Sequence, residues 1–172
     1  MSFSNLELVL PDAPATEALG AALASAYLGA GAGSAVIYLH GELGAGKTTC
    51  ARSLLRRLGV VALIRSPTYT LVETYRPGNG LNLIHVDLYR LEGADAVEEL
   101  GLRDTIGTDS LLLLEWPEKG AGALPPPDLE VTLTYAGDSR RAWLSARSGQ
   151  RGEWIAKLSR DTSLAPYVSN LT

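Results

Sequence analysis

The chain has 172 residues, 46% of them hydrophobic and 20% charged, which is typical of one globular domain and excludes a disordered or fibrous protein. A formal net charge of −4 without long basic runs argues against a large nucleic-acid footprint, and the single cysteine, Cys50, excludes an internal disulfide. Because no apolar run of about 18 residues occurs and the first residues lack a signal-peptide core, we expect a cytoplasmic protein that makes no membrane contact.

The first sixty residues alternate between strand-like and helix-like segments. Leu6–Leu10 is a short apolar strand before Pro11. Ala15–Leu28 has apolar side chains four residues apart, which predicts a helix that the following glycines end. Ser34–His40 is an apolar run typical of a strand buried on both faces. Lys47–Leu58 returns to helical periodicity after a glycine-rich loop.

The rest of the chain is richer in strands and turns. The predicted strands are Thr68–Tyr75 and Leu81–Tyr89, joined as an antiparallel hairpin, then Ser110–Glu115, and a closing hairpin of Leu129–Tyr135 and Ala142–Ala146. A short helix is expected within Ala94–Ile106 and a terminal helix at Trp154–Leu158, with a poorly ordered tail after about residue 160. The pattern predicts a single α/β domain over residues 1–172 with a mixed sheet.

The loop after the second strand carries the strongest motif. Gly41-Glu-Leu-Gly-Ala-Gly46-Lys47-Thr48 matches G-x-x-x-x-G-K-[ST], and it lies between an apolar strand and an amphipathic helix as a phosphate-binding loop does. Glycines allow backbone amides to turn toward phosphate oxygens, and the helix N-terminus adds its positive dipole. Lys47 is expected to neutralise the β- and γ-phosphates, and the Thr48 hydroxyl to be a Mg²⁺ ligand.

Two acids lie near strand ends. Glu115 ends an otherwise apolar strand, which resembles a Walker B position that holds the Mg²⁺ shell; the alternative is a solvent-exposed acid. Asp87 lies in an apolar strand, where a carboxylate is costly unless it meets donors or a cation. It is either a catalytic acid or the partner of Arg90 or Arg103 in a structural salt bridge.

Other polar residues near these motifs are less specific. Ser66, Thr68 and Thr70 could sense the γ-phosphate as switch loops do, or form an ordinary polar turn. His85 shares the face of Asp87, and we interpret both His85 and His40 as packed or hydrogen-bonded histidines. Trp116 is either a cap over the site or a core aromatic.

Five segments in this order resemble the TsaE (YjeE) family of small bacterial P-loop ATPases: Gly41–Thr49, Ser66–Leu71, His85–Arg90, Glu115–Glu118 and Leu124–Leu129. The resemblance runs from about residue 15 to residue 135, and Tyr69 stands where the family commonly has phenylalanine. It implies a P-loop NTPase-like three-layer fold with a mixed central sheet flanked by helices.

The resemblance also implies a function. Family members bind and hydrolyse ATP with Mg²⁺ and act with the proteins TsaD and TsaB in forming threonylcarbamoyladenosine in tRNA, meeting the tRNA only through that complex. We expect weak intrinsic turnover here, because the sequence offers no obvious arginine finger; Arg65 and Arg76 are the candidates.

Site residues follow from the motifs and the resemblance together. Lys47, Asp87 and Glu115 are expected to be catalytic, and Thr48 and Glu115 to hold Mg²⁺. A switch loop is expected at Ser66, Thr68 and Thr70, with Trp116 beside the acid. The residues expected to bind ATP are Thr16, Gly41, Leu43, Gly44, Ala45, Gly46, Lys47, Thr48, Thr49, Asp87 and Arg140, of which Thr16 and Arg140 are candidates for the adenine ring.

Two other functions stay open at the level of sequence. A small P-loop kinase would transfer phosphate to a hydroxyl, but it normally needs a lid with several arginines, where this chain has a hairpin and a Pro-rich connection. A nucleotide-gated binding module would use the same loop without useful hydrolysis.

Overall fold

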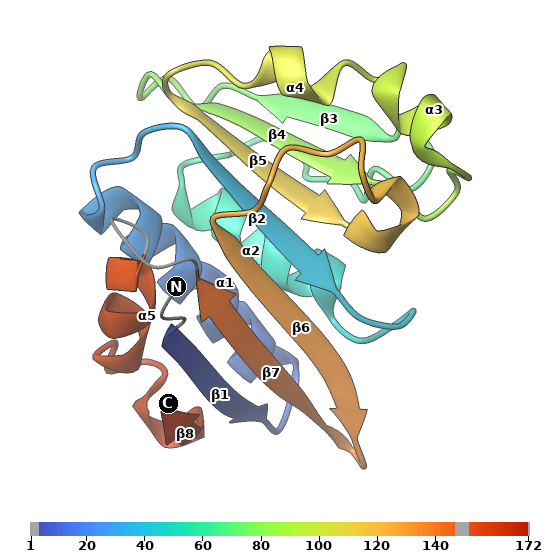
Figure 1. The fold of residues 1–172 in the computed structure, drawn as a ribbon. Coiled ribbons are helices and arrows are strands. Elements are labelled where there is room, and N and C mark those ends of the chain that lie inside the picture. Colours follow the sequence, from blue (N-terminus) through green and yellow to red (C-terminus); the bar gives the residue numbers. More distant parts are fainter. Residues whose placement is uncertain (1–3, 147–151, 172) are drawn as a thin grey trace.

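The computed structural model describes residues 4–146 and 152–171, in which eight strands form one mixed sheet in the order β3-β4-β5-β2-β6-β7-β1-β8 (Figure 1). Their bounds are β1 Ser4–Leu10, β2 Ala35–His40, β3 Val72–Tyr75, β4 Asn82–Asp87, β5 Ser110–Glu115, β6 Leu129–Ala136, β7 Ser139–Ala146 and β8 Val168–Leu171. The four strands β4, β5, β2 and β6 run parallel, and the outer strands pair antiparallel.

The parallel strands bring the sequence motifs to one edge of the sheet. In β4 and β5, Asp87 pairs with Glu115, and in β2 and β5, Leu39 pairs with Glu115. The carboxyl ends of all three strands therefore lie together at one edge of the sheet. The loop that begins at Gly41 follows β2 at this edge. Ligands of open α/β sheets bind at such an edge.

Helices cover the two faces of the sheet unequally. The helices α1 (Ala13–Gly29), α2 (Lys47–Arg57) and α5 (Gly152–Ser159) contribute to a core cluster with one face of the strands. On the other face, α3 (Ala94–Glu98), α4 (Leu102–Thr105) and the segment after the 3₁₀ helix η1 (Pro117–Gly120) pack against β2, β4 and β5. The layering is thus complete only over the parallel strands that carry the motifs.

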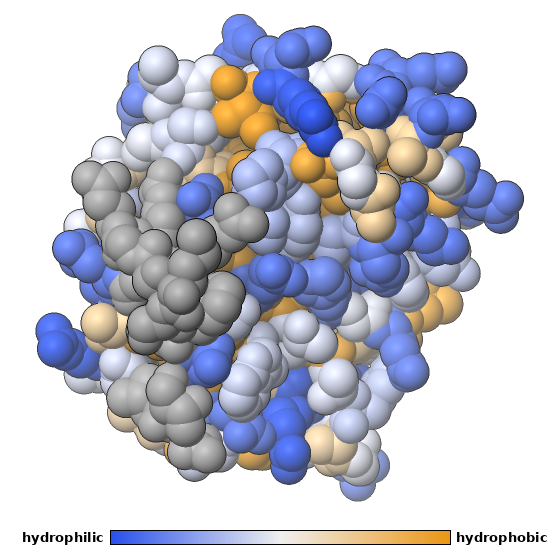
Figure 2. Space-filling model, viewed as in Figure 1, coloured by the Kyte–Doolittle hydropathy of each residue, from blue (hydrophilic) through white to orange (hydrophobic). Residues whose placement is uncertain are grey.

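The strands β6 and β7 have one face in solvent. Their residues alternate, with Val131 and Leu144 buried in the core and Thr134 and Arg141 exposed. Figure 2 shows this side of the molecule, where hydrophilic and intermediate residues cover most of the surface over β6 and β7. Alternation of this kind is typical of antiparallel strands that cover the core on one side only.

A close contact between α1 and α2 positions the helix that follows the loop. A Cβ added at Gly20 would lie 2.3 Å from the backbone oxygen of Cys50, so only glycine allows this approach. The first turn of α1 is capped by Asp12, whose carboxylate accepts a hydrogen bond from the Ala15 amide at 2.9 Å. The beginnings of α1 and α2 are held side by side near Gly46, whose added Cβ would lie 3.2 Å from Thr16.

The structure confirms the predicted mixed α/β fold and both antiparallel hairpins. Several elements differ from the prediction in their bounds or their number. Thr68–Thr70 is a turn rather than strand, because the Leu71 amide bonds back to the Pro67 oxygen and β3 begins only at Val72. The second strand of the closing hairpin begins at Ser139 rather than Ala142, and the Ala94–Ile106 segment holds two short helices.

After residue 160, where the sequence predicts a poorly ordered tail, the structure describes two short elements. Leu164 is buried, a 3₁₀ helix η2 spans Ala165–Tyr167, and β8 adds an antiparallel edge strand beside β1. Residue 172 lies outside the described residues. None of the described helices is long and apolar enough to cross a membrane.

Candidate nucleotide-binding site

The loop between β2 and α2 has the backbone that its glycines predict. Gly44 and Gly46 have φ angles of 78° and 108°, in the left-handed region that favours glycine. Ala45 closes a tight turn by donating its amide to the Glu42 oxygen at 3.1 Å. The loop then leads directly into α2 at Lys47, so the helix N-terminus faces the space that the loop encloses.

Lys47 is the cation of this loop. Its Nζ donates hydrogen bonds to the backbone oxygens of Gly41 and Glu42, and it lies 4.0 Å from the ring centroid of Trp116. Burial lowers the pKa of Lys47, while the nearby negative charges of Glu115 and Asp87 act in the opposite direction. The ammonium is held by neutral carbonyls that charged phosphate oxygens can replace.

Glu115 is buried, and its carboxylate is oriented from two sides. The Thr48 hydroxyl donates to Oε2 at 3.0 Å and also lies 3.2 Å from Oε1. On the other side, Nε2 of His85 lies 2.8 Å from Oε1. The alternative interpretation of Glu115 as a solvent-exposed acid is wrong, because its exposed fraction is 1%.

Asp87 is also buried and is held by the segment predicted as a switch. Thr68 donates its hydroxyl to Oδ2 of Asp87 at 2.8 Å, and the Tyr89 amide donates to Oδ1 at 2.9 Å. Because the one hydroxyl proton of Thr68 is used on Asp87, the Ser66 hydroxyl, 2.8 Å away, donates to Thr68.

The two arginines that a structural salt bridge of Asp87 would need have other contacts. The Arg90 guanidinium lies 4.0 Å from the ring centroid of Tyr69. Arg103 donates to the backbone oxygens of Gly122 and Ala123. The salt-bridge interpretation of Asp87 finds no support in these contacts, which leaves its carboxylate facing the loop.

One cavity of about 290 Å³ collects these groups. Its lining residues come from the loop, the first turn of α2, the switch segment and the ends of β4 and β5: Leu43, Gly44, Gly46, Lys47, Thr48, Thr49, Ser66, Thr68, Asp87, Tyr89, Glu115 and Trp116. A cation, two carboxylates and several hydroxyls therefore surround a single space of the size that a polyphosphate needs. We call this space the phosphate cavity.

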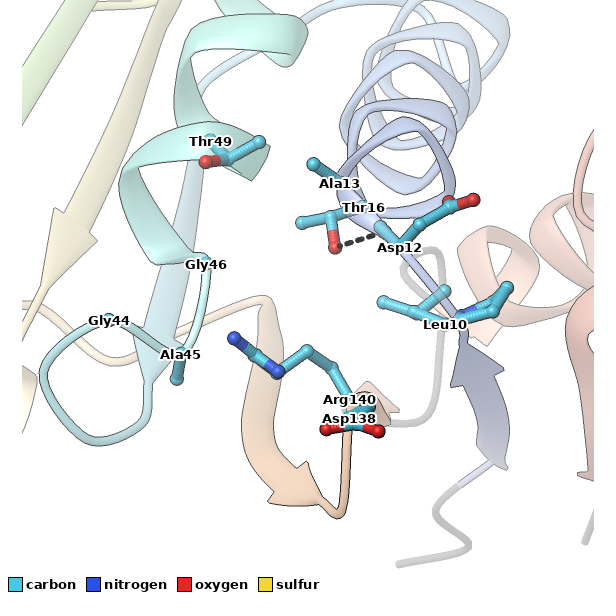
Figure 3. A pocket seen from close by; sticks show the side chains of 11 residues that line it. Leu10, Asp12, Ala13, Thr16, Gly44, Ala45, Gly46, Thr49, Asp138 and Arg140 are labelled. Atoms are coloured by element: carbon cyan, nitrogen blue, oxygen red, sulfur yellow. Dashed lines mark hydrogen bonds between the residues drawn. The ribbon is translucent and has the colours of Figure 1, made fainter.

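A second cavity, of about 170 Å³, lies on the other side of the loop. Figure 3 shows Arg140 extending from β7 toward Gly44–Gly46, with Thr16 of α1 and Thr49 of α2 on opposite sides of the space. The two cavities share Gly44, Gly46 and Thr49. This arrangement continues the phosphate cavity into a second one that the adenine candidates Thr16 and Arg140 line.

Some predicted site residues lie elsewhere. Thr70 is exposed and lines neither cavity. Gly41 contributes its carbonyl to Lys47 rather than a wall of the cavity. Arg65 and Arg76 also line neither cavity, and Arg76 borders a separate groove with Val60 and Val61. The arginine that reaches this region is Arg140, on the side away from the two acids.

Sequence reasoning missed several residues that the fold brings to the site. Tyr89 lines the phosphate cavity, and its ring centroid is 5.0 Å from that of Trp116. Tyr135 donates its hydroxyl to the Leu43 oxygen at 2.8 Å and lies under the Arg140 guanidinium. Asp138 lines the second cavity from the hairpin turn. For His85, the spacing of two residues from Asp87 already indicates a place on the same face of the strand. No local sequence feature indicates that Tyr135 lies at the site.

The donor set fits magnesium that arrives with a nucleotide. Among the described residues, no cluster of three or more His, Cys, Asp or Glu side chains is arranged to hold a metal ion by itself. Thr48 and Glu115 instead offer hard oxygen donors, which suit Mg²⁺ when phosphates complete its shell. The Thr48 hydroxyl keeps its lone pairs for a metal, because its proton points to Glu115.

Comparisons with known proteins identify relatives of this chain. Residues 10–143 match the family model of the threonylcarbamoyl adenosine biosynthesis protein TsaE. A Haemophilus influenzae protein named tRNA threonylcarbamoyladenosine biosynthesis protein TsaE is 46% identical over 113 residues, which are 66% of this chain and 71% of that protein. A Bacillus subtilis protein of the same name is 35% identical over 131 residues, or 76% and 81% of the two chains. The crystal structure of Bacillus subtilis YdiB superposes with a TM-score of 0.70 at 28% identity, covering 93% of this chain and 97% of the other.

Proposed function

The chain belongs to the TsaE family, and from that membership and its site we propose that it binds and hydrolyses ATP with Mg²⁺ to support the formation of threonylcarbamoyladenosine in tRNA. The names of its relatives support the place in tRNA modification. The observation that supports the ATPase chemistry is the phosphate cavity, in which Lys47, Asp87 and Glu115 all contribute to the lining.

Each side chain has a distinct part in the proposed reaction. The loop amides and Lys47 bind the phosphates, and Lys47 exchanges its carbonyl partners for phosphate oxygens. Thr48 and Glu115 hold Mg²⁺, which supplies neutralisation of the phosphate charge when bound. Asp87, fixed by Thr68 and the Tyr89 amide, orients the attacking water and accepts its proton.

The switch segment links the acid to the state of the nucleotide. Since the hydroxyls of Ser66 and Thr68 form a chain that ends on Asp87, a shift of this loop changes the hydrogen bonding of the acid. We propose that ATP with Mg²⁺ orders the loop and that hydrolysis releases it. The same loop lines the cavity through Ser66 and Thr68, so it can sense what the cavity holds.

The proposed partners are TsaD and TsaB, with tRNA met only through their complex. A chain with a net charge of −4 is a poor binder of RNA by itself, which supports an accessory role beside proteins that hold the tRNA. Weak turnover by the isolated protein is expected, because Arg65 and Arg76 line neither cavity and the second cavity places Arg140 away from the acids.

The test is ATP turnover with and without the partner proteins. Lys47→Ala and Glu115→Ala should each lower the rate by at least ten-fold, because the first removes the cation proposed to bind the phosphates and the second removes a proposed Mg²⁺ ligand. Lys157→Ala is the matched control, since this lysine lies on α5 and lines neither cavity. Full ATP turnover in either site variant would contradict the proposed mechanism. Normal tRNA modification by Glu115→Ala would favour a nucleotide-gated binding module instead.

A further inference from the structure

His85 occupies a position in β4 that packing alone would fill with an apolar residue. Its side chain is completely buried, and it shares a face with Leu83 and Asp87, two residues before and after it. In the two neighbouring strands it pairs with Leu113 of β5 and Glu73 of β3. Burying a polar ring in such surroundings costs free energy of folding unless the ring is hydrogen-bonded.

Among the described residues, the ring makes one hydrogen bond, which is to the carboxylate of Glu115. Nε2 of His85 lies 2.8 Å from Oε1 of Glu115, and both side chains are almost fully shielded from solvent. Within the described part of the chain, Nδ1 is buried without a hydrogen-bond partner. A residue kept only for packing would not leave a buried nitrogen unpaired, since this costs stability that an apolar side chain of similar size avoids.

The contact restricts the orientation of Glu115. Thr48 approaches the carboxylate mainly at Oε2, whereas His85 approaches only Oε1, so the two donors bracket the carboxylate. Partners of this kind, which bind the ligands of a metal rather than the metal, fix ligand orientation and commonly contribute ten- to hundred-fold to metal affinity.

We infer that His85 is a positioning residue that donates Nε2–H to Glu115 and thereby sets the affinity of the nucleotide-loaded site for Mg²⁺. The inference rests on the proposed function, because it concerns the same site. It requires a proton on Nε2 of His85, the ring nitrogen that faces Glu115. It also requires that loss of the donor affect Mg²⁺ more than it affects the nucleotide.

The first experiment reads the tautomer in the unmodified, metal-free protein. The chain has two histidines, so His40→Gln assigns the signals of His85 in a long-range ¹H–¹⁵N spectrum. We expect a protonated Nε2 on His85. The opposite tautomer would overturn the inference, because Nε2 would then have no proton to donate.

The second experiment separates metal from nucleotide. His85→Leu removes the donor while keeping the volume, and His85→Gln keeps a donor near the position of Nε2. Titrating Mg²⁺ at a fixed ADP concentration should show a half-saturating Mg²⁺ concentration about ten-fold higher or more for His85→Leu. For His85→Gln it should stay within about three-fold of the unmodified protein, and ADP affinity in EDTA should be unchanged in both variants.

The outcomes distinguish this inference from the function on which it rests. An unchanged Mg²⁺ requirement in His85→Leu, with normal nucleotide binding by the unmodified protein, overturns the positioning role alone. Equal losses of ADP affinity with and without Mg²⁺ would show a merely structural role and would overturn it too. If the unmodified protein binds no nucleotide, the proposed function fails and this inference fails with it.

Discussion

The contact between Tyr135 and the phosphate loop at Gly44 can be tested by substitution at both residues. A Cβ added at Gly44 would lie 2.6 Å from the Tyr135 hydroxyl, and the φ angle of Gly44 is 78°. The hydroxyl would have to move, and it would then lose its 2.8 Å hydrogen bond to the Leu43 oxygen. Gly44→Ala therefore combines backbone strain with a lost contact between β6 and the loop.

The two costs can be estimated separately. A left-handed backbone costs an alanine about 1–2 kcal/mol relative to glycine, and the lost hydrogen bond costs about 1 kcal/mol. Gly44→Ala should then destabilise the protein by about 2–3 kcal/mol. Tyr135→Phe removes only the hydroxyl and keeps the ring under Arg140, so it should cost about 1 kcal/mol.

Urea unfolding of the double variant decides whether the two substitutions are coupled. In Tyr135→Phe, the nearest remaining ring atom to the added Cβ is Cζ at 3.9 Å, so Gly44→Ala should cost only the backbone strain. Urea unfolding of the four proteins should give a coupling free energy of about 1 kcal/mol between the two sites. If Gly44→Ala costs the same in both backgrounds, the hydroxyl contact does not hold the loop and the reasoning is refuted.

Three further predictions concern the helices, the thiol and the switch. Gly20→Ala should lower the free energy of unfolding by about 1–2 kcal/mol in urea titrations, because the overlap with the Cys50 oxygen outweighs the gain in helix propensity; a stabilised variant would contradict the close helix contact. Burial raises the pKa of the Cys50 thiol to about 12, so a thiol reagent at about pH 8 should label the urea-unfolded chain but not the native one. The contribution of this shift to stability is present below the unfolded pKa of about 9 and is lost as the pH rises toward 12. Thr68→Val should lower kcat about ten-fold without changing ADP affinity, because it removes the hydroxyl that holds Asp87, while the exposed Thr70→Val should change neither; equal kcat values for the two variants would exclude the switch contact.

The sequence predicts the parallel part of the fold well, because its signals are local. β2 and β5 are uninterrupted apolar runs, and the loop that begins at Gly41 has a spacing that few other structures use. The register of the parallel strands then brings Asp87 and Glu115 together without further information. The loop motif alone predicts Lys47 and Thr48, and the end of an apolar strand predicts Glu115, whereas the catalytic role of Asp87 is a prediction that rests on the family resemblance.

Other features depend on contacts between distant segments. Thr68 belongs to a β-rich stretch, yet its hydroxyl binds Asp87, 19 residues away, and the backbone follows that contact into a turn. The final strand β8 pairs with the edge of β1, where backbone groups would otherwise be unpaired. No feature of the sequence of residues 168–171 indicates this strand. Tyr135 reaches Leu43 across 92 residues. Local propensity has no access to such pairings.

The central claim is that the loop from Gly41 to Thr48 grips the phosphates of ATP through its amides and the Lys47 ammonium. Calorimetric titration of ATP with Mg²⁺ into the full chain tests it most directly. The unmodified protein should bind one nucleotide with a saturable heat, and Lys47→Ala should bind at least ten-fold more weakly, because Lys47 is the only cation among the described residues that lines the phosphate cavity. No heat with the unmodified protein, or equal affinity in the variant, would contradict the account.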